Sequence, residues 1–146
     1  MYHGFGTTKD WAKAAGIFEQ LANDGHCDSQ FWIGCCYLDG WGVPKDYEKA
    51  FEWFGKSADQ DNSYGLWMVG YCSFYGRGAT EDKAAAVEWL CKSAQRGNRY
   101  GQCWLGNCYI NGWGVARDID TAVNWYRKSA DQGHEGAIGR LKEIGK

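Results

Sequence analysis

The sequence predicts an all-α solenoid built from 36-residue helix-turn-helix repeats, because the chain overlays itself when it is shifted by 36 residues. In each copy, two glycines enclose a single residue, and an aspartate follows them at a constant distance. The recurring residues are Gly4, Gly40, Gly76 and Gly112, then Gly6, Gly42, Gly78 and Gly114, and then Asp10, Asp46, Asp82 and Asp118. Self-similarity at a period of roughly 20–50 residues is typical of stacked repeat architectures.

The first half of each full copy predicts a helix. In SQFWIGCCYLDG, residues 29–40, small or apolar side chains recur at spacings of three and four residues, which is the helical period. This helix carries a recurring glycine and a recurring cysteine. They are Gly34, Gly70 and Gly106, and Cys36, Cys72 and Cys108. We expect the glycines to let neighbouring helices approach closely, and the cysteines to pack in the core as small apolar groups.

The second half predicts another helix, which starts at the recurring aspartate. Asp46 precedes YEKAFEWFGKSADQ, and its short carboxylate can accept hydrogen bonds from the free N–H groups of the first turn. Ala50 and Phe54 then lie on one apolar stripe. Gly97 and Gly133 stand near the ends of later copies, where glycine tolerates the left-handed backbone that ends helices. The Gly-x-Gly segments supply further positive-φ positions between the two helices.

A single two-helix unit cannot cover its own apolar stripe, whereas stacked neighbours cover it. We therefore expect one domain over residues 1–146. It consists of a partial unit at 1–26 with a helix over about 10–24, full units at 27–62, 63–98 and 99–134, and a more polar capping helix at 135–146.

Composition argues against several classes of partner. The net charge is −2 and no run of lysine or arginine is present, so no nucleic acid partner is expected. No stretch approaches the ~20 apolar residues of a membrane span, and the first residues lack the pattern of a secretory signal. Seven cysteines without such a signal favour a cytoplasmic protein with free thiols.

Neither a metal nor a cofactor is expected. The cysteines include no Cys-x-x-Cys pair, and His26 and His134 share a repeat position that predicts a solvated turn. Cys91 shares its position with Glu19 and Arg127, so it is expected to face solvent. GWGVPKD has no strand before it and lacks the full Gly-x-Gly-x-x-Gly spacing of a phosphate cradle. Without a catalytic set of residues, no enzymatic activity is expected.

The repeating unit, as it stands in residues 101–134, resembles the Sel1-like repeat, a relative of the tetratricopeptide repeat, and the resemblance covers essentially the whole chain from Gly4 on. The motifs are Leu-Gly-x-x-Tyr, Gly-x-Gly-Val, Asp and Ala-x-x-Trp-Tyr-x-Lys-Ser-Ala, all within 105–130. The middle unit departs from them at Ser73, Ala79 and Leu90. The resemblance implies a right-handed α-solenoid that acts as a scaffold or adaptor without catalytic residues. A cysteine-rich branch of the family carries one disulfide per unit, which does not fit a chain in which one cysteine position recurs.

The resemblance also implies that the first helices line a concave face and that positions one turn either side of the core glycine face the groove. The candidate partner-binding residues are Phe31, Leu38, Tyr64, Trp67, Tyr71, Phe74, Tyr75, Tyr100, Asn107 and Asn111. An aromatic groove centre with a polar rim is typical of a peptide-binding hot spot. The alternative is that some of these rings pack against each other between units.

Tryptophan is used at two further places. Trp32 and Trp104, with Met68 between them, form a second column at one edge of the first helices. Trp41 and Trp113 stand at the middle of Gly-x-Gly turns, where each ring either covers the adjacent core or forms a second exposed patch.

The sequence therefore predicts a non-catalytic adaptor or scaffold that binds a peptide or protein segment on its concave face. The alternative is a structural or self-associating segment of a larger repeat-containing signalling protein. Self-association would then use the ends of the solenoid, because an open repeat end invites further units of the same kind.

Overall fold

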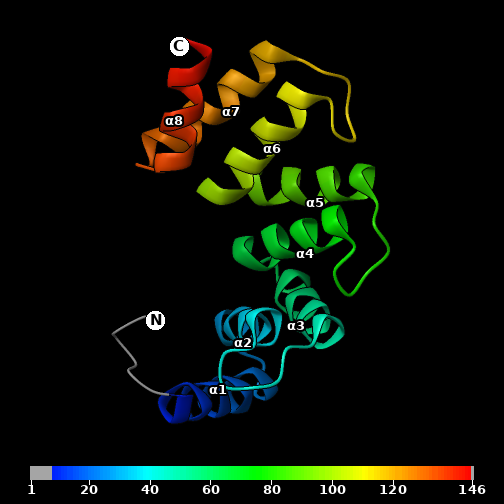
Figure 1. Ribbon diagram of the computed structural model, residues 1–146, viewed down its shortest axis with the longest axis vertical. Helices are drawn as coiled ribbons and strands as arrows, with labels where there is room; N and C mark the ends of the chain where they lie inside the picture. The colour runs from blue at the N-terminus through cyan, green and yellow to red at the C-terminus, as the bar shows by residue number, and fades with distance from the viewer. Residues whose placement is uncertain (1–7, 146) are drawn as a thin grey trace.

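The computed structural model describes residues 8–145, and within this range the chain forms eight helices and no strand (Figure 1). The helices are α1 (Thr8–Asn23), α2 (Cys27–Asp39), α3 (Tyr47–Asp59), α4 (Ser63–Tyr75), α5 (Lys83–Gln95), α6 (Arg99–Asn111), α7 (Ile119–Asp131) and α8 (Glu135–Ile144). The predicted all-α class is confirmed.

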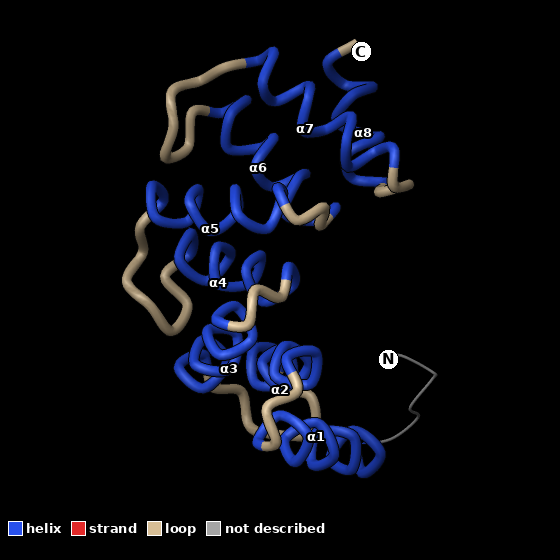
Figure 2. The backbone as a smooth tube through the Cα atoms, turned by 180° about the vertical axis from the view of Figure 1, so that it is seen from behind, coloured by secondary structure: helices blue, strands red, loops and turns tan. Residues whose placement is uncertain are grey.

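The helices stack in chain order into a curved solenoid (Figures 1 and 2). Each helix contacts the next one along the chain, and in addition α2 contacts α4 and α4 contacts α6. Helices α2, α4, α6 and α8 follow the inner side of the curve, whereas α3, α5 and α7 lie on its outer side (Figure 1). The first helix of each unit therefore faces the hollow of the solenoid.

The recurring aspartates begin the outer helices, as predicted for three of the four copies. Asp46, Asp82 and Asp118 stand at the N-cap positions of α3, α5 and α7. Their Oδ1 atoms accept hydrogen bonds from the backbone N–H groups of Lys49, Ala85 and Thr121 at 3.1, 3.0 and 3.1 Å. The fourth prediction is wrong: α1 begins at Thr8, so Asp10 lies inside its first turn. An acidic side chain there still interacts favourably with the positive end of the helix dipole.

The Gly-x-Gly turns after α2, α4 and α6 use both of their glycines in the left-handed region, as predicted, whereas Gly4 and Gly6 lie outside the described residues. Gly76 has φ 69° and ends α4, and Gly78 has φ 76°. Gly78 also lies directly against the backbone of Tyr47, at the start of α3 in the preceding unit, where a Cβ would overlap the carbonyl group. Gly42 and Gly114 lie in the same way against Trp11 and Lys83. The second glycine of each turn therefore docks one unit onto the unit before it.

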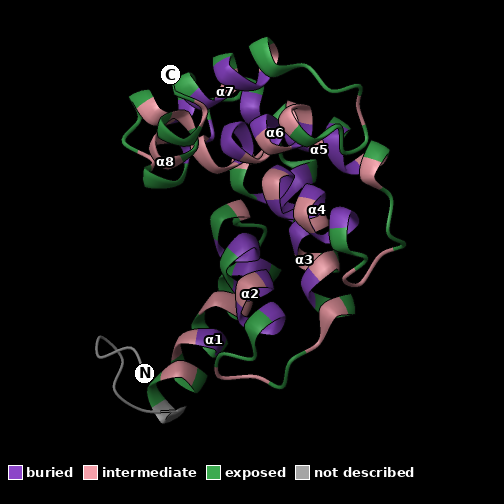
Figure 3. Ribbon diagram, turned by 45° about the horizontal axis from the view of Figure 1, so that its top comes forward, coloured by how far each residue is buried: buried purple, intermediate pink, exposed green. Residues whose placement is uncertain are grey.

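The core glycines bring the two helices of a unit together, as predicted. A Cβ on Gly34 would lie 2.6 Å from Cε1 of Phe54, whose ring is fully buried in α3. Gly106 meets the ring of Tyr126 at the same separation of 2.6 Å. Buried residues accordingly follow the faces along which the helices meet, whereas the long connections after α2, α4 and α6 are mostly exposed or half-buried (Figure 3).

A buried serine on each outer helix fixes the start of the neighbouring inner helix. Ser57, Ser93 and Ser129 are fully buried. Their hydroxyl groups donate to the backbone carbonyl oxygens of Cys27, Ser63 and Arg99 at 2.9, 2.8 and 2.7 Å. These acceptors are the first residues of α2, α4 and α6. Each hydrogen bond therefore holds the N-terminal turn of an inner helix against the outer helix of the same unit.

The recurring cysteines are core residues, as predicted. Cys36, Cys72 and Cys108 are buried, and burial raises the pKa of Cys36 and Cys108 to about 11 and the pKa of Cys72 to about 12. Cys27 and Cys91 are only half-buried, so Cys91 is less open than the full exposure expected for it.

We expect a thiol-alkylating reagent to separate these two groups of cysteines. At pH 8 the native protein should react at Cys27 and Cys91 at least ~100-fold faster than at Cys72, because the reactive species is the thiolate. Mass spectrometry of the alkylated protein measures the rates, and the guanidinium-unfolded chain, in which the difference disappears, is the control. Equal rates at Cys72 and Cys91 in the native protein would contradict the core assignment.

Candidate functional site

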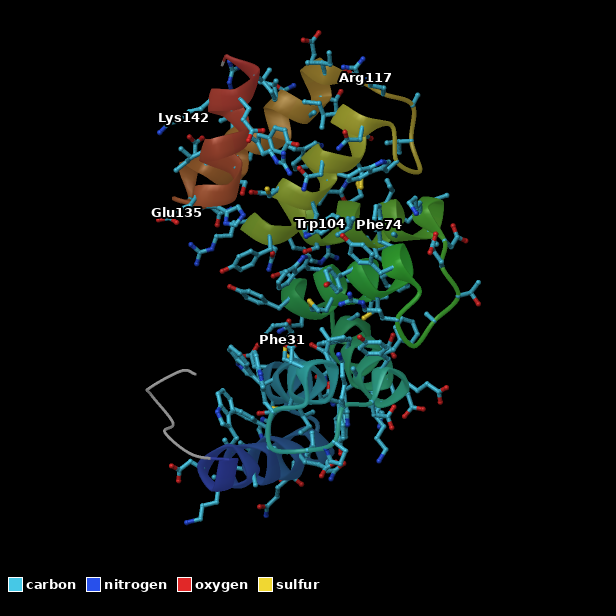
Figure 4. The ribbon with its side chains drawn as sticks, in the orientation of Figure 1. Phe31, Phe74, Trp104, Arg117, Glu135 and Lys142 are labelled. Carbon is cyan, nitrogen blue, oxygen red and sulfur yellow. The ribbon has the colours of Figure 1, made fainter. Side chains whose placement is uncertain are left out.

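A pocket of about 520 Å³ opens on the inner face where α2, α4 and α6 come together. We call it the aromatic pocket. Its lining residues are Asp28, Phe31, Trp32, Tyr64, Trp67 and Tyr100. Asp28, Tyr64 and Tyr100 occupy one repeat position, in the first turn of each inner helix. Figure 4 shows Phe31 on the inner side of the curve, where α2 meets α4. The pocket therefore draws on three successive units.

The rings of the aromatic pocket contact each other across the unit boundaries. Trp67 stacks on Tyr100 with ring centroids 4.7 Å apart and an interplanar angle of 20°. The Phe31 centroid lies 5.3 Å from Tyr64 and 6.5 Å from Trp67, and Trp32 meets Phe31 edge to face at 5.1 Å. Stacked and edge-to-face pairs of this kind hold aromatic side chains in fixed orientations. The pocket walls are therefore largely preformed.

Some of these rings pack between units, and others stay exposed on the inner face. Phe31 is 7% exposed and rests on Phe54, 6.1 Å away, so it forms the floor of the pocket. Tyr64 and Trp32 remain 37% and 48% exposed and form its open walls. Inter-unit packing thus positions the rings, and a substantial apolar surface stays free on the inner face.

Few polar groups accompany the rings. The Oδ1 atom of Asp28 accepts a hydrogen bond from Nδ2 of Asn62 at 2.7 Å, and Asn62 also caps α4. Nε1 of Trp67 is buried and has no hydrogen-bond partner among residues 10–145. Leaving a buried N–H unpaired costs about 1–3 kcal/mol. The contacts that the structure shows for this indole are with the rings of Phe31 and Tyr100.

Beyond Tyr100, the series of contacting rings in the aromatic pocket continues to a histidine at the start of α8. His134 meets Tyr100 edge to face at 5.1 Å. Burial, and then the nearby Arg99 guanidinium, lower the pKa of His134 below its ordinary value. His134 is therefore mainly uncharged at neutral pH and continues the series as an aromatic ring.

Tyr71 and Tyr75, both predicted for the groove, belong to a second group of rings. They surround Arg77 together with Tyr47, and the guanidinium carbon lies 5.3, 5.3 and 5.5 Å from the Tyr71, Tyr75 and Tyr47 centroids. Nη1 of Arg77 also donates a hydrogen bond to the Tyr71 hydroxyl at 2.8 Å. We call these four residues the arginine cluster. Its aromatic faces are already in contact with a cation of the same chain.

Leu38 and Phe74 are buried rather than open to the groove, which corrects their expected exposure. They share one repeat position and are 6% and 5% exposed. Trp104 and Trp113 both approach the Phe74 ring, with centroids 5.4 Å away (Phe74 and Trp104 in Figure 4). For Phe74, rings from the next unit therefore cover a position that the resemblance to the Sel1-like repeat places in the groove.

The two predicted asparagines take part in hydrogen bonds within their own unit. Oδ1 of Asn107 accepts from the buried Tyr126 hydroxyl at 2.6 Å. Nδ2 of Asn111 donates to the Asn107 carbonyl oxygen at 2.9 Å. Neither residue lines the aromatic pocket.

The tryptophans at the edge of the first helices and in the Gly-x-Gly turns have different surroundings in the structure. Trp32 joins the aromatic pocket, whereas Met68, at the same repeat position, is buried. Trp41 and Trp113 each lie against another ring, 5.2 Å from Trp11 and 5.4 Å from Phe74, yet stay 39% and 37% exposed. Each turn tryptophan thus covers a neighbouring ring with part of its surface and leaves the rest open.

Trp32 was expected in a second column at the edge of the first helices and not among the ten candidate binding residues. Asp28 is not one of those ten either, but the same mapping places it in the groove, because it shares the repeat position of Tyr64 and Tyr100. Among the side chains of residues 10–145, no three His, Cys, Asp or Glu groups gather in a way that suits a metal ion. None of the helices between residues 8 and 145 combines the length and apolar character needed to cross a membrane.

Comparisons with known structures find the same architecture. A Sel1 repeat protein from Oxalobacter formigenes is 27% identical with a TM-score of 0.88, and the match covers 92% of this chain and 54% of that one. A protective antigen of uropathogenic Escherichia coli, which displays the same repeat fold, is 34% identical with a TM-score of 0.83 over 95% of this chain and 30% of that one. Cysteine-rich protein B of Helicobacter pylori is 25% identical with a TM-score of 0.71, over 94% of this chain and 100% of that one.

The chain thus spans about half of the first relative and less than a third of the second. A comparison with the curated proteins finds no significant match. The Sel1 repeat pattern matches residues 1–26, 27–62, 63–98 and 99–134 in succession. On these matches, the chain belongs to the Sel1 repeat family.

Proposed function

We propose that this chain is a non-catalytic interaction module that binds a segment of a partner protein on its inner face, in the aromatic pocket. The observation that carries the proposal is the meeting of rings from three successive units around an opening of about 520 Å³. Sel1 repeat proteins are generally protein-interaction modules, which supports the class of function.

The physical basis is preorganised apolar surface. Tyr64 and Trp32 leave much of their rings exposed, and burying a large apolar side chain contributes about 1.5–3 kcal/mol. The stacked pair of Trp67 and Tyr100 is fixed before a ligand arrives, so little conformational entropy is lost on binding. An extended segment that places one side chain in the pocket would also contact the inner helices on either side.

A peptide-display selection on the immobilised chain tests this proposal. Peptides enriched on the wild type should lose at least ~10-fold in affinity for Trp67→Ala, because buried aromatic anchors dominate such interfaces. Tyr64→Ala is the second variant, since its exposed ring can be removed with little effect on folding. Isothermal titration calorimetry measures the affinities, and circular dichroism confirms that each variant is folded.

Trp41→Ala is the matched control, because Trp41 is similarly exposed but lies in a turn outside the pocket. We expect it to bind the selected peptides as the wild type does. If Trp41→Ala weakens binding and Trp67→Ala and Tyr64→Ala do not, the docking site is the turn surface and the proposal is wrong. A failure to select any peptide would also count against it.

A further inference from the structure

We infer that the aromatic pocket receives an arginine side chain of the partner segment, with the guanidinium group at the Asp28 end. This inference rests on the proposed function and names the residue type that the same pocket would recognise. Five aromatic rings and a single carboxylate line the pocket. An aromatic face carries negative charge density and attracts a cation held within about 6 Å of its centroid. Ring faces beside a carboxylate therefore complement a cationic group better than a neutral one.

The chain's own cations cover aromatic rings at many other places. On the outer helices, Lys56, Lys92 and Lys128 lie over Trp53, Trp89 and Trp125 at 4.5, 4.7 and 4.6 Å from the ring centroids. Among residues 10–145, no lysine or arginine lies in this way over Phe31, Trp32, Tyr64 or Trp67. Trp32 and Tyr64 stay 48% and 37% exposed, so these two rings are available to a cation from another molecule. Phe31 is buried, and Phe18 stacks on one face of Trp32 with ring centroids 6.1 Å apart.

The two ends of the pocket differ in charge. Arg99 lies 5.6 Å from the centroid of Tyr100, at the α6 end, and would repel a second cation there. Asp28 lies at the α2 end, where its carboxylate accepts one hydrogen bond from Asn62 and has the capacity for more. The incoming cation is therefore directed toward Asp28 and toward the exposed rings of Trp32 and Tyr64.

The arginine cluster shows that this fold already holds a guanidinium group among several rings. Arg77 contacts Tyr47, Tyr71 and Tyr75 at 5.3–5.5 Å and hydrogen-bonds to one of their hydroxyls. A planar, weakly hydrated guanidinium stacks on aromatic faces more readily than an ammonium group, which keeps a strong hydration shell. Arginine is therefore favoured over lysine for the aromatic pocket, where the rings supply most of the contact.

A nuclear magnetic resonance titration with paired peptides tests the inference. The probe is acetyl-Gly-Ala-Arg-Ala-Gly-amide. It is compared with two peptides of the same sequence, one with the uncharged citrulline and one with the cationic lysine in place of arginine. The indole N–H signals of Trp67 and Trp32 report binding. We expect the arginine peptide to bind about tenfold more tightly than the citrulline peptide, in line with cation–ring attraction. We expect the lysine peptide to fall between them.

Asp28→Asn removes the charge and keeps the shape of the side chain, and should weaken arginine binding about three- to tenfold while leaving citrulline binding unchanged. Asp39→Asn is the matched control, because Asp39 is an exposed carboxylate on the same helix but outside the pocket. Trp32→Ala, which removes an exposed ring of the pocket, should lower arginine affinity even if Asp28→Asn perturbs folding.

Three results would overturn the inference. The first is equal affinity for arginine and citrulline peptides, and the second is tighter binding of lysine. The third is the absence of indole shifts with any of the three probes up to about 10 mM, the range of very weak binding, while peptides from the display selection still bind. That third result would refute arginine recognition and leave the proposed docking function intact, whereas loss of the selected peptides as well would refute both.

Discussion

Replacing Gly78 with alanine is expected to destabilise the chain by about 3–5 kcal/mol, among the largest effects of any single substitution. Gly78 has φ 76°, and a residue with a Cβ pays about 1–2 kcal/mol to occupy this left-handed region. The new Cβ would also overlap the carbonyl group of Tyr47 and lie 3.0 Å from Cβ of Phe51. Because Tyr47 and Phe51 both belong to the preceding unit, the steric overlap can be removed only if the two units move apart.

Gly97→Ala separates the backbone cost of Gly78→Ala from its steric cost. Gly97 has φ 86°, yet a Cβ there would meet no atom within 4 Å. We expect Gly97→Ala to cost only the conformational penalty of about 1–2 kcal/mol. Chemical denaturation of the two variants beside the wild type gives both free energies of unfolding. Equal losses at the two positions would show that Gly78 does not dock the turn onto the preceding unit.

Truncating Phe54 to alanine is expected to cost about 3–5 kcal/mol, because it opens a cavity in the core. The Phe54 ring is fully buried, fills the space above Gly34 and supports Phe31 from below. The substitution should therefore also loosen the floor of the aromatic pocket. Thermal unfolding followed by circular dichroism should show a fall in Tm of roughly 10 °C, given the usual dependence on chain length.

Phe54→Leu is the control for the alanine variant, because the chain itself places Leu90 at the same repeat position in the next unit. Leu90 packs on Gly70 as Phe54 packs on Gly34. We expect Phe54→Leu to cost less than about 1.5 kcal/mol, since an apolar residue of similar size keeps most of the contacts. If Phe54→Ala lowered the free energy of unfolding no more than Phe54→Leu, the ring would not stabilise the contact between α2 and α3.

Much of the fold could be predicted from the period of the sequence. A recurring residue occupies an equivalent place in each unit, so one argument serves several positions at once. This is why the caps at Asp46, Asp82 and Asp118, the close contact at Gly34 and the burial of Cys72 all agreed with expectation. Asp10 did not, because α1 starts three residues earlier than its counterparts in the later units.

The outline of the candidate site was less predictable, because it depends on residues that do not recur. The resemblance to the Sel1-like repeat placed Phe74 in the groove but could not show that Trp104 and Trp113 from the next unit lie over it. In the same way, Tyr71 was expected in the groove, whereas Arg77 from the adjacent turn occupies its ring face. Contacts between units depend on side-chain orientations across an interface, which spacing along one helix does not specify.

The most direct test of the central proposal is to locate a display-selected peptide on the chain by nuclear magnetic resonance. Intermolecular nuclear Overhauser effects would be measured between the unlabelled peptide and the ¹³C-labelled aromatic rings of the protein. The proposed function predicts contacts to Phe31, Tyr64 and Trp67, on the inner face. Contacts confined to Trp41 and Trp113, with none to these three rings, would contradict it.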